Sequence, residues 1–103
     1  MLCGAAVLLA QSTVPQMKSV APDTAKSGDE LTVTGENLDQ ANVADVFLTD
    51  GTHDFKTTIT SQEAGSLKVK VPAGAKAGRL ALMVLTKGKD AKLIEQPVKV
   101  NIE

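Results

Sequence analysis

The sequence predicts an all-β fold in which two layers of short strands pack face to face. Three observations lead to this prediction. Apolar and polar residues alternate with a period of two in most segments, as in strands with one buried face. Turn-forming Gly, Pro and Asp residues interrupt these segments at roughly the spacing seen in β-sandwiches. No segment shows a helical repeat of apolar residues sustained over several turns.

The first expected strand lies between Pro15 and Pro22, with Met17 and Val20 as its apolar residues. Proline at both ends is typical of an edge strand, because proline cannot donate a hydrogen bond to a neighbouring strand. We therefore place this segment at the edge of a sheet.

The second expected strand lies within residues 28–38. Leu31 and Val33 face the core in this strand, while Thr32 and Thr34 face solvent, because successive side chains point to opposite faces. The segment ends in the sequence Gly-Glu-Asn-Leu, in which the glycine and asparagine are typical of a strand exit.

The third expected strand also alternates, and a turn at Asp50–Gly51 ends it. Its predicted inner face consists of Ala44, Val46 and Leu48. Its predicted outer face consists of Asp45, Phe47 and Thr49.

Four further strands are expected at residues 57–61, 67–71, 80–85 and 98–102. Residues 80–85 are apolar at every position, which is typical of a central strand covered on both faces. Seven short strands separated by turns predict a β-sandwich of the immunoglobulin type.

Composition narrows the classes of function. The chain has 103 residues, so we expect one folded domain. Its net charge of −1 argues against nucleic acid, which favours a basic surface. The chain has no Trp, no Tyr and only two Phe residues, so it has few rings on which bases or sugars could stack.

The first residues are apolar and small, and we interpret residues 1–12 as the end of a secretory signal peptide whose start lies upstream. The domain would then comprise residues 13–103. The apolar run is too short to cross a bilayer, so we expect no transmembrane span. The sequence thus predicts a secreted, periplasmic or cell-surface protein. Cys3, the only cysteine, would be removed with the signal.

His53 is the only histidine, and Asp50 and Asp54 are close to it in sequence. A zinc site needs three or four ligands, and no second histidine is available. The spacing of Asp45, Asp50 and Asp54 matches no calcium-binding loop. We interpret these residues as solvated turn residues and expect no metal, no cofactor and no enzymatic activity. A minimal hydrolase centred on His53 is the less favoured alternative.

An outward apolar group is the most informative candidate site. If residues 80, 82 and 84 face the core, then Ala81, Met83 and Leu85 face outward. Phe47 joins them if the third and sixth expected strands pair. Such a patch is either a docking surface or is covered by a loop, the N-terminal segment or a neighbouring domain. The sequence leaves both alternatives open.

Four segments in order resemble the IPT/TIG family, the immunoglobulin-like domains of plexins and transcription factors. They are residues 15–22, 28–38, 43–51 and 66–72. The chain departs from the family pattern in having a single glycine, Gly28, before the second strand and Ile102 in place of a terminal aromatic residue. The resemblance implies a seven-stranded early-set immunoglobulin-like sandwich that acts as a non-catalytic module.

Three hypotheses for function follow. The first is an exported binding or spacer module that contacts a protein partner or neighbouring domain through Phe47, Ala81, Met83 and Leu85. The second is a carbohydrate-binding accessory domain at a cell surface or beside a polysaccharide-acting enzyme. The third is the hydrolase centred on His53.

Overall fold

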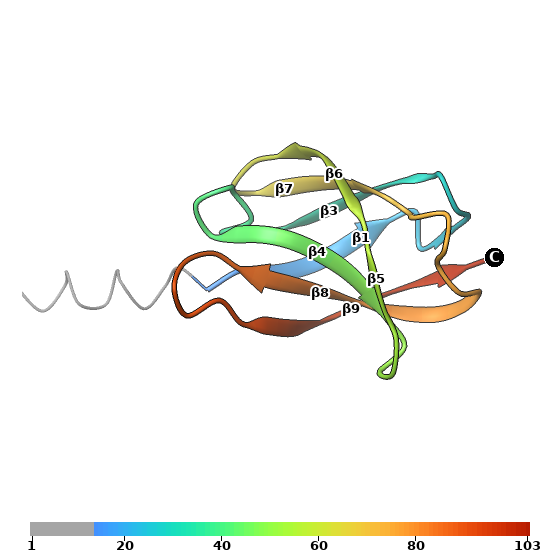
Figure 1. Cartoon of the computed structure of the whole chain (residues 1–103). Helices are drawn as coiled ribbons and strands as arrows, with labels where there is room; N and C mark the ends of the chain where they lie inside the picture. The colour runs from blue at the N-terminus through green and yellow to red at the C-terminus, as the bar shows by residue number, and fades with distance from the viewer. Residues whose placement is uncertain (1–13) are drawn as a thin grey trace, which may run out of the picture.

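The computed structural model describes residues 14–103, which form two β-sheets packed face to face (Figure 1). One sheet has four strands in the order β1-β3-β7-β6, and the other has five in the order β2-β9-β8-β4-β5. The strands are β1 (Gln16–Ala21), β2 (Thr24–Ala25), β3 (Glu30–Glu36), β4 (Val43–Thr49), β5 (Asp54–Lys56), β6 (Thr58–Gln62), β7 (Ser66–Lys70), β8 (Gly78–Thr86) and β9 (Leu93–Ile102). The prediction of an all-β sandwich is confirmed.

The core lies between the sheets and consists of the inward residues of each strand. Leu31 and Val33 of β3 are fully buried, as predicted from their alternation with threonine. The largest fully buried side chains are Met17, Leu31, Leu38, Leu48, Leu67, Leu80 and Leu82. Burial of these aliphatic side chains is the main term that stabilises a domain with so few aromatic residues.

The predicted count of seven strands is wrong, because the described residues form nine. The two additional strands are short. β2 pairs in parallel with the end of β9, and β5 pairs with the end of β4. Strands of two and three residues carry no alternating pattern of their own, and they are defined only by the distant segments with which they pair.

The last strand was predicted to begin at residue 98, but β9 begins at Leu93. Proline is unusual inside a central strand because it cannot donate to the ladder. Pro97 is tolerated since the pairing of β8 with β9 is interrupted there, between the Ala81–Lys99 and Met83–Glu95 pairs. Inward alternation continues across the interruption, so that Ile94 packs against the core.

The predicted inner face of β4 is wrong at its start. Val43 is buried and Ala44 is only half-buried, because a β-bulge shifts the pairing with β8 between Val43 and Asp45. Beyond the bulge, Val46 and Leu48 face the core as predicted.

The Gly-Glu-Asn-Leu segment ends β3 through three local requirements. A Cβ atom at Gly35 would overlap the carbonyl oxygen of Gln16 and lie 2.9 Å from the Cα atom of Met17. Asn37 adopts a positive φ of 57°, which asparagine tolerates better than most residues. Leu38 then turns into the core and is fully buried. The end of β3 is therefore fixed by the close approach of β1 at Gly35, the backbone conformation of Asn37 and the burial of Leu38.

A buried glutamine joins the two sheets at the edge strand β1. The Oε1 atom of Gln96 on β9 accepts a hydrogen bond of 2.8 Å from the backbone N–H of Met17. Both residues are buried, at 5% and 2% exposed. The contact satisfies a backbone donor of β1 that faces the other sheet.

Replacing Gln96 by methionine is expected to destabilise the domain by about 1–2 kcal/mol, because the buried N–H of Met17 loses its acceptor. Urea denaturation measures the change in the free energy of unfolding. The matched control is Gln16→Met, at an exposed position of β1, which should change the free energy of unfolding by less than about 0.5 kcal/mol. Equal effects of the two substitutions would contradict this role of Gln96.

Candidate functional site

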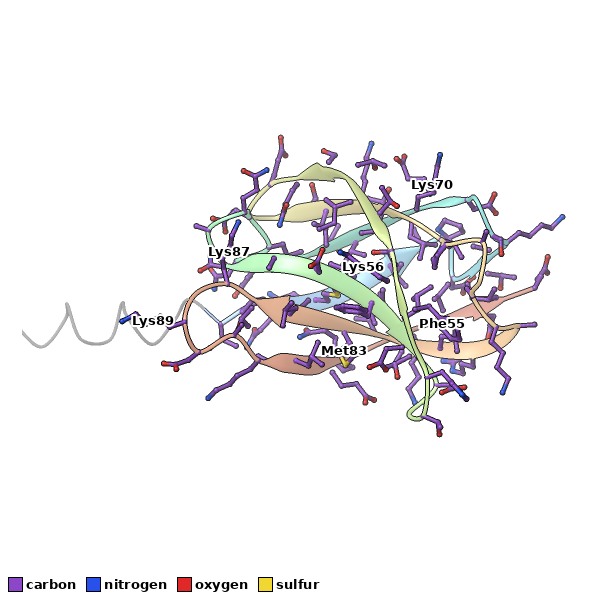
Figure 2. The ribbon with its side chains drawn as sticks, viewed as in Figure 1. Phe55, Lys56, Lys70, Met83, Lys87 and Lys89 are labelled. Atoms are coloured by element: carbon purple, nitrogen blue, oxygen red, sulfur yellow. The ribbon has the colours of Figure 1, made fainter. Side chains whose placement is uncertain are left out.

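The four outward residues predicted from the sequence lie together on the outer face of the five-stranded sheet. Strands β4 and β8 pair as expected, and Phe47 lies directly opposite Met83. Neither residue belongs to the core cluster, whereas their neighbours Leu48 and Leu82 do. Figure 2 shows Met83 on β8, which lies between β9 and β4 in the sheet.

Their exposure differs along the sheet. Ala81 and Met83 are only 5% and 8% exposed, although they face away from the core. Phe47 and Leu85 are half-buried. Glu95 lies beside Met83 on β9, and Lys56 lies beside Phe47 on β5. Long charged side chains cover apolar neighbours with their aliphatic stems while the charged ends remain in water.

Leu93 is a further member of this surface that the sequence analysis missed. It lies directly opposite Leu85 in the pairing of β8 with β9 and is 52% exposed. The sequence does contain a sign of this strand, because apolar Leu93 lies two positions before Glu95 and four before Pro97. We did not predict a strand in this segment. We define the outer apolar strip as Phe47, Ala81, Met83, Leu85 and Leu93.

The outer face of the four-stranded sheet is different in character. Ser19, Thr34, Lys68 and Lys70 are exposed on β1, β3 and β7. They alternate with the buried residues of these strands, so they form a polar face. Partly exposed apolar side chains on the outside of the sandwich are thus concentrated on the five-stranded sheet.

His53 lies in the turn between β4 and β5, and its side chain is 65% exposed. Its Nδ1 atom is 3.5 Å from Oδ2 of Asp50. The Asp50 side chain closes the turn, since Oδ1 accepts the backbone N–H groups of Thr52 at 2.8 Å and His53 at 2.6 Å. These backbone donors hold the pKa of the Asp50 carboxyl at about 2, below its ordinary value of 3.8. Asp50 has a structural role in this turn.

No group of three or more metal-ligating side chains occurs within residues 14–103. In the same part of the chain, no helix has the length and apolar character needed to cross a membrane. Cys3 and the expected signal segment lie outside the described residues.

The fold and the strip define a class of protein: an immunoglobulin-like β-sandwich with a partly exposed apolar strip on one sheet. The chain belongs to the IPT/TIG domain family, whose model matches residues 15–101. The resemblance seen in the sequence is confirmed. Domains of this family are typically non-catalytic.

Solved structures with the same fold include domains of larger bacterial proteins. A Bacteroides thetaiotaomicron protein of unknown function is 20% identical, with a TM-score of 0.72 over 87% of this chain and 22% of its own. A γ-CGTase from an alkalophilic Bacillus clarkii is 16% identical, with a TM-score of 0.67 over 86% of this chain and 12% of its own. SGBP-B of a Bacteroides ovatus mixed-linkage glucan utilization locus, solved with a mixed-linkage heptasaccharide, is 21% identical, with a TM-score of 0.61 over 89% of this chain and 23% of its own.

This chain therefore spans less than a quarter of each of these three proteins. At these identities the likeness concerns the fold alone. The search of curated proteins found no match.

Proposed function

We propose that this domain is a non-catalytic module that contacts a protein partner or a neighbouring domain through the outer apolar strip. The observation that carries the proposal is half-exposed Leu93 beside half-buried Leu85, with half-buried Phe47 on the same face of the sheet. The corresponding face of the other sheet is polar. Family membership supports it, because TIG domains mediate protein contacts. A contiguous apolar strip with a charged rim is typical of such contact surfaces.

A spacer role is consistent with the position of the two chain ends. The described chain starts near the turn between β8 and β9, and it ends at the opposite end of the sandwich (Figure 1). Domains joined to the two ends would be held apart by the length of the strands. The solved structures of the same fold support this role, since the fold forms a small part of each longer chain. We propose an exported location from the apolar residues 1–12.

The partner can be found by placing a photo-crosslinking amino acid at position 93 and, as a matched control, at position 34. Both sites are exposed, but Leu93 lies on the strip and Thr34 lies on the polar face of the other sheet. We expect a specific cross-linked product from position 93 in the source organism. A product formed only from position 34 would contradict the proposed contact face.

The pair Leu85→Lys and Leu93→Lys is expected to weaken binding of the purified partner by roughly tenfold or more, because each lysine places a charge in an apolar contact. Isothermal titration calorimetry measures the affinity. These positions are preferred to Met83, which is only 8% exposed, so that a lysine there would also disturb the sheet. The melting temperature should fall by no more than roughly 4–8 °C, which corresponds to a loss of about 1 kcal/mol at half-buried Leu85. Unchanged affinity of a folded variant would contradict the proposal.

Carbohydrate binding is the second candidate function. SGBP-B, one of the proteins of similar fold, was solved with a bound heptasaccharide, and this favours the candidate. The absence of Trp and Tyr disfavours it, because sugar rings commonly stack on such side chains. A glycan array without signal for the purified domain would remove the candidate.

A further inference from the structure

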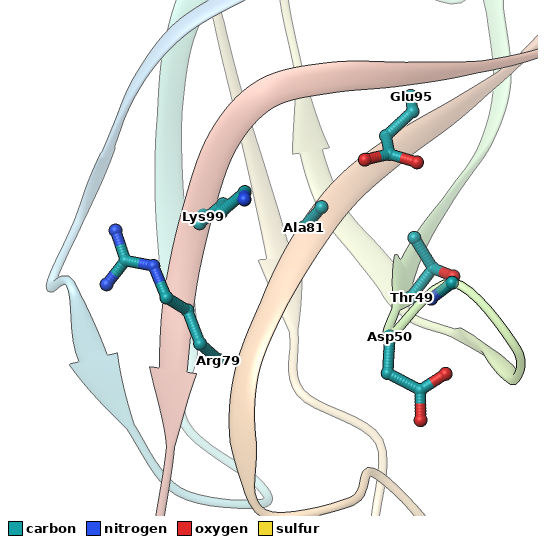
Figure 3. A pocket seen from close by; sticks show the side chains of 7 residues that line it. Thr49, Asp50, Arg79, Ala81, Glu95 and Lys99 are labelled. Atoms are coloured by element: carbon teal, nitrogen blue, oxygen red, sulfur yellow. The ribbon is translucent and has the colours of Figure 1, made fainter.

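A polar hollow of about 140 Å³ lies on the outer face of the five-stranded sheet, at the Ala81 end of the outer apolar strip (Figure 3). Its floor is formed by Ala81 and Thr49, which lie opposite each other on β8 and β4 and are 5% and 4% exposed. The side chain of Lys99 lies beside Ala81, whereas the guanidinium group of Arg79 points away from Ala81, across β9 (Figure 3). The hollow exists because two small residues pair at this point of the sheet.

Four charged residues line the hollow: Asp50, Arg79, Glu95 and Lys99. Asp50 is already engaged by its own turn, as described above, and its Oδ2 atom is 3.7 Å from the Nζ atom of Lys76. In Figure 3 its carboxylate points away from Ala81. Lys76 therefore offsets the charge of Asp50.

Of the other three charged residues, Lys99 and Glu95 are available to a ligand, whereas Arg79 is directed toward Asn101. Arg79 makes one long hydrogen bond of 3.5 Å, from Nη1 to Oδ1 of Asn101. Within residues 14–103, no ion pair within 4.0 Å involves Lys99 or Glu95. Figure 3 places Lys99 on one side of Ala81 and Glu95 on another. The hollow thus offers one ammonium group and one carboxylate, which lie on different sides of its floor.

We propose that this hollow binds a monosaccharide-sized ligand that carries a carboxylate, such as a hexuronate unit. Its carboxylate lies beside Lys99, whose ammonium group donates charge-assisted hydrogen bonds to a carboxylate. Its hydroxyl groups lie beside Glu95, which accepts their hydrogen bonds. The hollow is smaller than the roughly 300 Å³ of ordinary small-molecule sites, so it accommodates one sugar unit and binds it weakly.

This inference rests on the second candidate function and specifies its ligand. It is tested by NMR titration of the ¹⁵N-labelled domain with methyl glucuronide and, separately, with methyl glucoside. We expect the amides of Thr49, Ala81 and Lys99 to shift with the glucuronide at roughly millimolar concentration. We expect binding of the glucoside to be weaker by roughly fivefold or more, because it lacks the charge.

The substitution Lys99→Gln should weaken glucuronide binding by roughly fivefold, while Lys89→Gln, an exposed lysine in the turn between β8 and β9, should leave it unchanged. Equal binding of glucoside and glucuronide would overturn the carboxylate inference but keep carbohydrate binding. Equal binding of acetate and glucuronide would show that no sugar is recognised. Absence of any amide shift with the glucuronide would overturn the inference. Absence of binding to both sugars would also remove the second candidate function.

Discussion

The substitution Gly35→Ala is expected to destabilise the domain by about 3 kcal/mol, which would lower its melting temperature by roughly 12–24 °C. The added methyl group would overlap the carbonyl oxygen of Gln16, which is main chain and cannot rotate away. Strand β1 would have to move away from β3, and the hydrogen bond of Met17 to Gln96 would be strained with it. Urea denaturation monitored by circular dichroism gives the free energy of unfolding.

Gly65 provides the matched control, since its carbonyl oxygen accepts the backbone N–H of Gly35 at 3.1 Å. A Cβ atom at Gly65 would meet no atom within 4 Å. The substitution Gly65→Ala should therefore change the free energy of unfolding by less than about 0.5 kcal/mol. If Gly35→Ala were as mild as Gly65→Ala, the close approach of β1 to β3 would be wrong.

The substitution Leu82→Ala is expected to cost about 3–4 kcal/mol, since it removes a fully buried side chain from the central strand β8 and leaves a cavity between the sheets. In a domain of this size, that loss is a large part of the total stability. Thermal and urea unfolding should both report it.

Leu85→Ala on the same strand is the control for Leu82→Ala. Leu85 faces outward and is half-buried, so its truncation should cost only about 1 kcal/mol. Similar losses for the two leucines would show that the assignment of inner and outer faces of β8 is incorrect.

The alternation of apolar and polar residues was sufficient to predict the long strands and most of the core. Leu31, Val33, Leu67 and Val69 face inward because a two-residue period matches the strand geometry. The same period could not reveal β2 and β5, which are too short to show it. It also failed at Ala44, because a β-bulge adds one residue and reverses the alternation.

The candidate site was predictable in its position but not in its exposure. Local alternation placed Phe47 and Met83 on one face, and the pairing of β4 with β8 confirmed that placement. Coverage of Met83 depends on neighbouring strands brought together by the fold, such as the segment of β9 that contains Glu95. Leu93 was missed because the last strand was expected only at residues 98–102, whereas β9 begins at Leu93. The hollow over Ala81 likewise depends on cross-strand pairs that no local pattern encodes.

The central claim is that the strip lies outside a two-layer sandwich, and nuclear Overhauser contacts between side chains test it most directly. The account predicts contacts of the Phe47 ring with the Met83 methyl group, and of Leu85 with Leu93, because these pairs lie opposite each other on adjacent strands. It predicts none between the Phe47 ring and Leu67, which is buried on the inner face of the other sheet. Contacts of Phe47 with Leu67 would place the strip in the core and contradict the proposed docking surface.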